Sequence, residues 1–212
     1  MTRSIVFLAL LFVLSVSARA AEMSASTNAP VIDGADIANY GVSNGTDKWW
    51  WGENDPAGSA KGQTFTTGDL KVMLKAITYQ VADTQKAEPT KTYAIRVGSL
   101  FGNVFTELRS ETATQTFTWN SSEYMTWRLE TPVLLEANTR YGVDVGMTHS
   151  TTGWRTGIPY IQMTANVYSG GSRYTSGRGG IGDPLVAIDG SRDRIFHLDL
   201  EYLPHGFQLI FE

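Results

Sequence analysis

The sequence predicts an all-β fold, an antiparallel two-sheet β-sandwich or jelly roll of about nine to eleven strands. Residues 115–145 carry the clearest signal, because aromatic and β-branched side chains alternate there with polar ones. A period of two residues is typical of a strand with one buried face. Only 18% of the residues are charged, and no stretch has the apolar stripe of an amphipathic helix. The absence of an internal repeat argues against a propeller or β-helix.

The beginning of the chain predicts an export signal. Arg3 precedes an apolar run over residues 5–16, and Ala18-Arg19-Ala20 has the small-x-small pattern of a cleavage site. The run is about a dozen residues long, whereas a membrane-spanning helix needs roughly 20; an uncleaved anchor is the alternative. We therefore expect a signal peptide over 1–20, a flexible lead-in over 21–30 and a single β-sandwich domain over 31–212.

The next part of the chain predicts short strands separated by polar turns. Between Leu70 and Val81 the alternation changes phase, since Leu74 and Ile77 both occupy apolar positions although they are three residues apart. Such a slip predicts a bulge near Lys75-Ala76 with both residues buried. The strands are expected around 37–40, 62–67, 70–81, 93–97 and 105–110, with a polar loop over 41–61.

The central pair of strands follows the same rule. Trp127 and Leu129 share one face of the first strand, residues 136–139 reverse the chain, and Tyr141 begins the inward face of the second, with Asp144 opposite. One buried core is expected from side chains in matching phase. These are Trp127, Leu129, Tyr141, Val143, Val145, Phe117, Phe196 and Leu198.

The last third predicts two more strands around a glycine-rich loop. Residues 157–165 read as a strand, and residues 168–183 contain too much glycine to be expected to pack. In the closing strand, 194–202, the expected inward residues are Phe196, Leu198 and Leu200, and the outward ones Ile195, His197 and Asp199.

Several segments resemble the jelly-roll, carbohydrate-binding-module-like domains of secreted bacterial surface proteins. They are GQTFTTG at 62–68, AITYQV at 76–81, TPVLLEANTRYGVDV at 131–145 and DRIFHLDL at 193–200. Many members of that group carry a C-terminal sorting tail with a Pro-Glu-Pro-type motif, an apolar helix and basic residues. This sequence stops at Phe211-Glu212 without one, so we expect a freely secreted, extracellular protein, with the periplasm as the alternative.

Net charge and cysteine content limit the kinds of partner and covalent attachment that are expected. The net charge is −4, and removal of Arg3 and Arg19 with the signal leaves 15 of the 17 basic residues against 21 acidic ones, or −6. This balance argues against a nucleic-acid partner, which needs a basic stripe. No cysteine is present, so neither a disulfide nor a lipid-attachment cysteine is available. We expect a monomer with no transmembrane segment after cleavage.

Aromatic residues in three loops and one strand, together with one arginine, are the candidate carbohydrate-binding residues. An indole ring offers a flat surface for the C–H face of a sugar and an N–H for a hydroxyl. Three adjacent tryptophans cannot all face one core, so at least one is expected to be exposed. The alternative is that they close one end of the sandwich. The candidates are Trp49, Trp50, Trp51, Trp154, Arg155, Tyr160 and Tyr174.

Acidic residues near the end of the chain raise the question of calcium. Residues 189–193 match the first positions of a calcium loop but lack its later glycine and acid, which excludes an EF-hand. The resemblance implies a structural calcium, with Asp193 and Asp199 as candidate ligands, and no cofactor is otherwise required.

Signals for catalysis are sparse. No thiol nucleophile, GxSxG, HExxH or P-loop pattern occurs. A polysaccharide lyase on this scaffold would need a Tyr or His base beside an arginine. The only set that could serve is His149, Arg155, Tyr160 and His197.

We therefore expect a non-catalytic, lectin-like domain that binds a poly- or oligosaccharide through exposed aromatic residues. A polysaccharide lyase, or more broadly a glycoside hydrolase, is the enzymatic alternative. A structural protein of the extracellular matrix or cell surface is the third.

Overall fold

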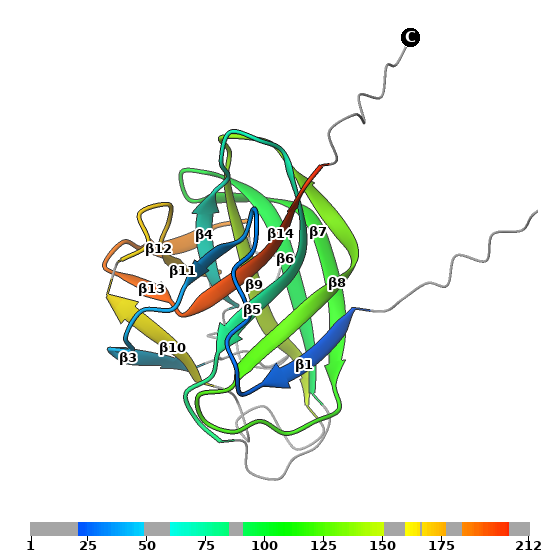
Figure 1. Ribbon diagram of the computed structural model, residues 1–212, viewed down its shortest axis with the longest axis vertical. Helices are drawn as coiled ribbons and strands as arrows, with labels where there is room; N and C mark the ends of the chain where they lie inside the picture. The colour runs from blue at the N-terminus through cyan, green and yellow to red at the C-terminus, as the bar shows by residue number, and fades with distance from the viewer. Residues whose placement is uncertain are drawn as a thin grey trace, which may run out of the picture.

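The computed structural model of the chain is built from antiparallel β-sheets (Figure 1). It describes residues 21–48, 60–84, 91–150, 160–165, 167–176 and 184–203. Fourteen strands lie in these ranges, more than predicted, because short strands also form in segments expected to be a lead-in or loops. Within the same ranges there is no helix, and hence none that could cross a membrane.

The first large sheet has five strands in the order β1-β8-β5-β14-β2. Every neighbouring pair in it is antiparallel. The strands are β1 (Glu22–Ser26), β8 (Tyr124–Leu135), β5 (Val72–Gln80), β14 (Phe196–Tyr202) and β2 (Ile37–Asn39).

The second large sheet has six strands in the order β12-β11-β4-β9-β6-β7, again antiparallel throughout. The strands are β12 (Val186–Asp189), β11 (Arg173–Ser176), β4 (Lys61–Thr66), β9 (Arg140–Ser150), β6 (Lys91–Phe101) and β7 (Val104–Gln115).

A small third sheet has the order β13-β10-β3, formed by β13 (Arg192–Arg194), β10 (Tyr160–Ala165) and β3 (Gly45–Lys48). In Figure 1 the five-stranded sheet lies in front of the six-stranded sheet, and the small sheet lies to one side, near β11 and β12.

The two large sheets enclose one apolar core. The eight side chains predicted to share a core all belong to it, with Phe117 partly buried at its edge. Trp127 is completely buried and packs edge-on against Tyr79 and Tyr93, with ring centroids 6.2 and 5.8 Å apart. The prediction is confirmed because alternation in β8 and β9 is enforced by burial of one common face.

The predicted irregularity in β5 is confirmed. Pairing with β8 shifts register between Leu74 and Ala76, and Leu74 and Ile77 are both fully buried. The extra residue, Lys75, directs its ammonium group to the carboxylates of Asp199 and Glu201 on β14, at 3.1 and 3.4 Å. The bulge therefore changes which residues of β5 face solvent.

Two segments predicted to be irregular form strands. Within 21–30, β1 pairs with β8 and places Met23 opposite Trp127, so this segment is not a flexible lead-in. Within 168–183, β11 pairs with β4 and β12. Glycine content misled the prediction there, because Tyr174 of β11 is fully buried against the glycines of neighbouring strands.

Three residues predicted to face outward are buried. Ile195 and His197 are 3% and 4% exposed, and Asp144 of β9 is completely inaccessible. The outer face of β9 is covered because Tyr174 lies over it and donates its hydroxyl hydrogen to Asp144 at 3.0 Å. These corrections have one cause: segments distant in sequence cover the faces that local alternation assigns to solvent.

Candidate functional site

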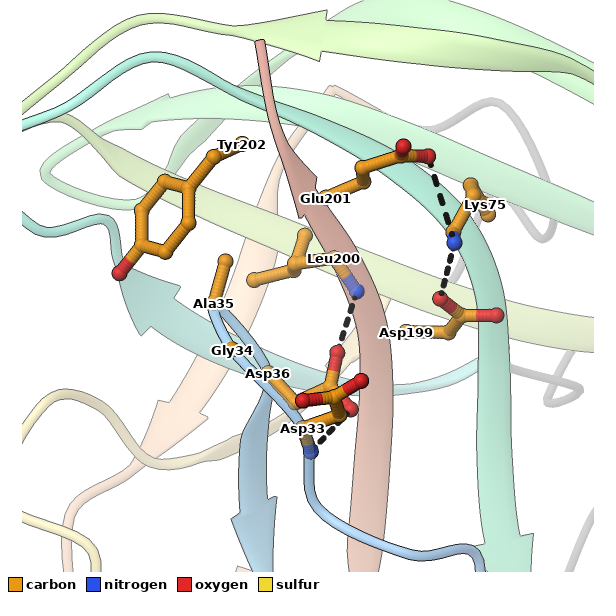
Figure 2. A pocket seen from close by; sticks show the side chains of 9 residues that line it. All are labelled: Asp33, Gly34, Ala35, Asp36, Lys75, Asp199, Leu200, Glu201 and Tyr202. Carbon is orange, nitrogen blue, oxygen red and sulfur yellow. Dashed lines mark hydrogen bonds and ion pairs between the residues drawn. The ribbon is translucent and has the colours of Figure 1, made fainter. Parts of the chain in front are cut away.

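A pocket of about 360 Å³ opens beside β14, where that strand passes the turn before β2 (Figure 2). This volume lies in the range of small-ligand sites. The pocket is rich in carboxylates and has one lysine. Its lining residues are Asp33, Gly34, Ala35, Asp36, Lys75, Asp199, Leu200, Glu201 and Tyr202.

Asp36 fixes the turn to β14. Its Oδ1 accepts a hydrogen bond from the backbone N–H of Leu200 at 2.7 Å, and its Oδ2 accepts one from the N–H of Asp33 at 3.0 Å. Oδ2 also lies 3.0 Å from Nε2 of His197. Because its oxygens are engaged by three protein groups, Asp36 supports the pocket rather than offering a free acceptor to a ligand.

Lys75 forms ion pairs with two of the carboxylates that line the pocket. Figure 2 shows its ammonium group between the carboxylates of Asp199 and Glu201. The hydrogen bond that Lys75 donates to Asp199 raises the pKa of Lys75, and Glu201 acts in the same direction. Asp199 also accepts a hydrogen bond from Arg128 at 3.2 Å.

Two groups at the pocket remain open to a ligand. The carboxylate of Asp33 and the hydroxyl of Tyr202 make no hydrogen bond to any residue that the structure describes. Tyr202 is 47% exposed, so its ring offers a surface as well as a polar tip. A carboxylate that accepts from sugar hydroxyls beside an aromatic ring suits a neutral sugar.

A second charged group lies between the small sheet and the six-stranded sheet. Asp47 of β3 is contacted by Lys61 at 3.3 Å, by Arg173 at 3.1 Å and by Arg194 at 3.1 Å. These four residues are called the Asp47 cluster below. Arg173 is held on its other side by Asp189, at 2.5 Å.

Electrostatics within the Asp47 cluster are dominated by its cations. Burial by itself would raise the pKa of Asp47, but the charges of Arg194, Lys61 and Arg173 outweigh it and hold that pKa below its ordinary value. Burial lowers the pKa of Lys61, and Asp47 opposes this effect only in part. The cluster therefore keeps its carboxylate ionised at the expense of a lysine that is less easily charged.

Tyr160 lies at one end of the small sheet, at the start of its middle strand. It begins β10, is half-buried, and its backbone N–H donates to the carboxylate of Asp83 at 2.9 Å. In the pairing of β10 with β3, Tyr160 is the register partner of Lys48. Lys48 immediately precedes Trp49 in the sequence, and Tyr160 follows the segment that contains Trp154 and Arg155.

The other predicted carbohydrate-binding residues divide into two groups. Trp49, Trp50, Trp51, Trp154 and Arg155 lie outside the described residues. Tyr174 is described and is fully buried, with its hydroxyl hydrogen-bonded to Asp144. Burial raises the pKa of Tyr174 well above its ordinary value. The ring of Tyr174 therefore has no face for a sugar, and the prediction that it binds carbohydrate is corrected.

The predicted histidine candidates have different surroundings. His149 lies on β9. His197 is enclosed by Asp36 and by Tyr40, whose ring is nearly parallel to the imidazole at a centroid distance of 6.3 Å. Asp36 is the carboxylate partner of His197. This arrangement holds β2 against β14 and leaves the imidazole without access to a substrate.

The two predicted calcium ligands are engaged by protein groups. Asp193 is completely buried, and its carboxylate accepts from the Gln63 side chain at 3.0 Å and from the N–H groups of Val167 and Tyr168 at 2.8 Å each. Asp199 is paired with Lys75 and Arg128. Among the described residues no group of three acidic or histidine side chains could hold a metal ion.

Sequence reasoning did not select the residues that line the pocket or complete the Asp47 cluster. Asp33 and Asp36 are about 165 residues from the β14 residues they meet, and no local pattern relates them. For Arg194 a signal existed: in the run Arg192-Asp193-Arg194 the two arginines occupy one face of a strand. The sequence interpretation instead placed Arg192 and Asp193 in the partial calcium-loop match over 189–193 and Arg194 at the start of the closing strand.

Comparisons with known proteins add little to this description. No family model and no curated protein matches the chain. A solved structure of the cysteine protease and lectin-like domains of Cwp84, a surface-layer-associated protein of Clostridium difficile, is similar to it with a TM-score of 0.45 and 9% sequence identity. The match covers 68% of this chain and 32% of that one. A likeness at this level carries no functional argument.

Proposed function

We propose that this protein is a secreted, non-catalytic carbohydrate-binding protein, and that the end of the small sheet where β3 ends and β10 begins carries its glycan site. The observation that supports this most directly is the pairing of Tyr160 with Lys48. It joins the borders of two segments that were selected separately for their aromatic residues. The proposed ligand is a poly- or oligosaccharide bound by a monomer, outside the cell.

A jelly-roll scaffold is part of the proposal. Eight strands, β2, β4, β5, β6, β7, β8, β9 and β14, account for the centre of both large sheets. Across the two sheets they lie in the orders β2-β14-β5-β8 and β4-β9-β6-β7. Along the chain these strands alternate between the two sheets, except that β6 and β7 are neighbours in one sheet, and two nested Greek keys produce this arrangement. The other strands are then additions at the edges, three of which form the small sheet.

The chemistry at the end of the small sheet where β3 ends and β10 begins fits sugar recognition. Sugar rings present C–H faces that stack on aromatic rings and hydroxyls that exchange hydrogen bonds with charged side chains. Tyr160 is only half-buried. This aromatic residue thus stands at the end of one candidate segment, and its register partner Lys48 stands directly before the other.

The alternatives predict other arrangements. A lyase needs a histidine or tyrosine base that reaches substrate, whereas His197 is enclosed by Asp36 and Tyr40. A structural surface protein needs no exposed aromatic cluster, and it would keep its fold and bind no glycan when Tyr160 is changed. Carbohydrate binding by stacking differs from lyase activity because it requires no proton transfer. It differs from a structural role because it requires an exposed aromatic ring.

Titration of the mature protein against a panel of polysaccharides tests the proposal. Alanine at Trp49, Trp50, Trp51, Trp154 or Tyr160 should weaken binding by about 1–3 kcal/mol for each ring that stacks on sugar, with unfolding temperatures nearly unchanged. Asp33→Asn and Tyr202→Ala serve as matched variants at the other pocket. If only these two weaken binding, the site is the pocket in Figure 2. If no glycan binds, the proposal fails.

A further inference from the structure

Two arginines of β13 extend across the small sheet onto β3. Arg194 reaches Asp47, as described above, and the guanidinium of Arg192 lies over Gly45, where an added Cβ would be 2.5 Å from its Nη1. Gly45 and Asp47 are two residues apart and share one face of β3, just as Arg192 and Arg194 share one face of β13. The close approach of Arg192 depends on the missing side chain at Gly45.

The donors of these two guanidinium groups are not all used. Nε of Arg194 donates to the carbonyl of Gly62 at 2.9 Å, and Nη2 donates to Asp47 and to the carbonyl of Tyr174. Its Nη1 is buried without a hydrogen-bond partner among the described residues. The guanidinium of Arg192 has neither a hydrogen bond nor an ion pair with any residue in that part of the chain. Buried donors are nearly always satisfied, so a free one requires an explanation.

Charge around Asp47 is also unbalanced. Arg173, Arg192 and Arg194 supply three guanidinium groups, whereas the carboxylates of the described residues that contact them are those of Asp47 and Asp189, and Asp47 is also shared with Lys61. Asp47 already receives three cations and has little capacity for a fourth. An excess of positive charge in a largely buried site is costly unless an anion compensates it. The whole chain has a net charge of −4, so this local excess of positive charge is opposite in sign to the charge of the protein.

We propose that Arg192, together with the buried guanidinium of Arg194, forms a binding site for an oxyanion, a carboxylate or sulfate group. The planar fork of a guanidinium matches two oxygens of such a group. Arg192 is half-buried and provides the contact open to solvent, while Arg194, fully buried, contributes a fixed positive charge two residues along the same face of β13. This site goes beyond the proposed function and does not depend on it. If the glycan site also exists, the oxyanion belongs to a uronic acid or a sulfated sugar.

Inorganic sulfate is the first probe, because it contains no sugar. Sulfate stabilises proteins in general, so its effect must be compared between variants at matched ionic strength with chloride as the reference. The wild-type protein and Arg109→Gln, a change on β7 far along the sheet from β11, should show the same sulfate-dependent rise in unfolding temperature. In Arg192→Gln the specific part of this rise should vanish, and sulfate affinity by titration calorimetry should fall about tenfold or more.

Behaviour without sulfate separates a binding role from a structural one. Arg192→Gln removes an uncompensated charge, so in chloride its unfolding temperature should equal or exceed that of the wild type. Arg192→Lys keeps the charge but loses the fork, and it should recover only part of the affinity. Equal sulfate responses in the wild type and Arg192→Gln, or a loss of stability in chloride alone, would overturn the proposal.

Two glycan titrations then identify the source of the oxyanion. A uronic acid oligosaccharide and a sulfated one are compared with a neutral oligosaccharide of equal length. If either acidic chain competes with sulfate and loses affinity in Arg192→Gln, the oxyanion is carried by sugar. If sulfate binds and neither chain competes, the site takes a free anion, and the proposed glycan function is then judged only by the tryptophan and Tyr160 variants.

Discussion

Asp144→Asn should destabilise the protein by about 3–5 kcal/mol, the cost of leaving a buried charge without its partner. Arg96 and Asp144 are 1% and 0% exposed and form a two-point pair, with Nε donating to Oδ1 at 2.9 Å and Nη2 to Oδ2 at 2.7 Å. The amide keeps the shape of the carboxylate but removes its charge, so the guanidinium of Arg96 loses the only carboxylate it contacts among the described residues. The ring of Phe105, 4.6 Å from Cζ of Arg96, compensates in small part.

Equilibrium unfolding in urea measures this effect, with the slope used to check that the unfolded state is unchanged. The double variant Arg96→Met/Asp144→Asn removes the stranded charge and should therefore be more stable than Asp144→Asn alone. Tyr174→Phe should cost only about 1–2 kcal/mol, because it deletes one hydrogen bond and no charge. Near-wild-type stability of Asp144→Asn would refute the reasoning, since it would mean that Arg96 is solvated.

Three further outcomes are expected. Trp127→Ala should lower the unfolding free energy by about 3–5 kcal/mol in the same assay, because the indole is completely buried in the core; near-wild-type stability would contradict its placement there. Gly62→Ala should destabilise by about 1–3 kcal/mol or more, since the added Cβ would lie 2.3 Å from Cζ of Tyr174, whereas Gly68→Ala, with no atom within 4 Å, is the matched control and should be tolerated. Asp47 has a lowered pKa in the folded protein, so its contribution to stability is complete above the ordinary value of 3.8 and is lost as the pH falls through the folded value; thermal unfolding between pH 7 and 2 should show this slope, and Asp47→Asn should reduce it.

The proposed glycan site could be predicted from sequence only in part. Residue type led to Tyr160 and the tryptophans, because stacking on sugar depends on an aromatic ring wherever it occurs. The same reasoning failed for Tyr174, since type says nothing about burial, and here β11 pairs with β4 over more than 100 residues of chain. Arg194 and Asp36 were missed for the same reason, because their partners lie on strands distant in sequence.

The sequence by itself determined the local elements whose evidence is periodic. Alternation in β8 and β9 identified their buried faces, and the change of phase at Lys75 located a bulge that both neighbouring strands share. These features follow from the two-residue period of a strand. When one face of a strand is buried, apolar side chains must occupy every second position.

Only the tertiary structure decided which strands are also covered on the face that alternation assigns to solvent. Asp144 and His197 occupy positions that alternation assigns to solvent, yet Tyr174 covers one and Asp36 with Tyr40 covers the other. Each covering group comes from a separate strand or turn, and its position depends on the order of strands within the sheets. Strand order is a property of long-range pairing, which local periodicity does not encode, so the charged sites of this protein arise from the packing of strands that are far apart in the chain.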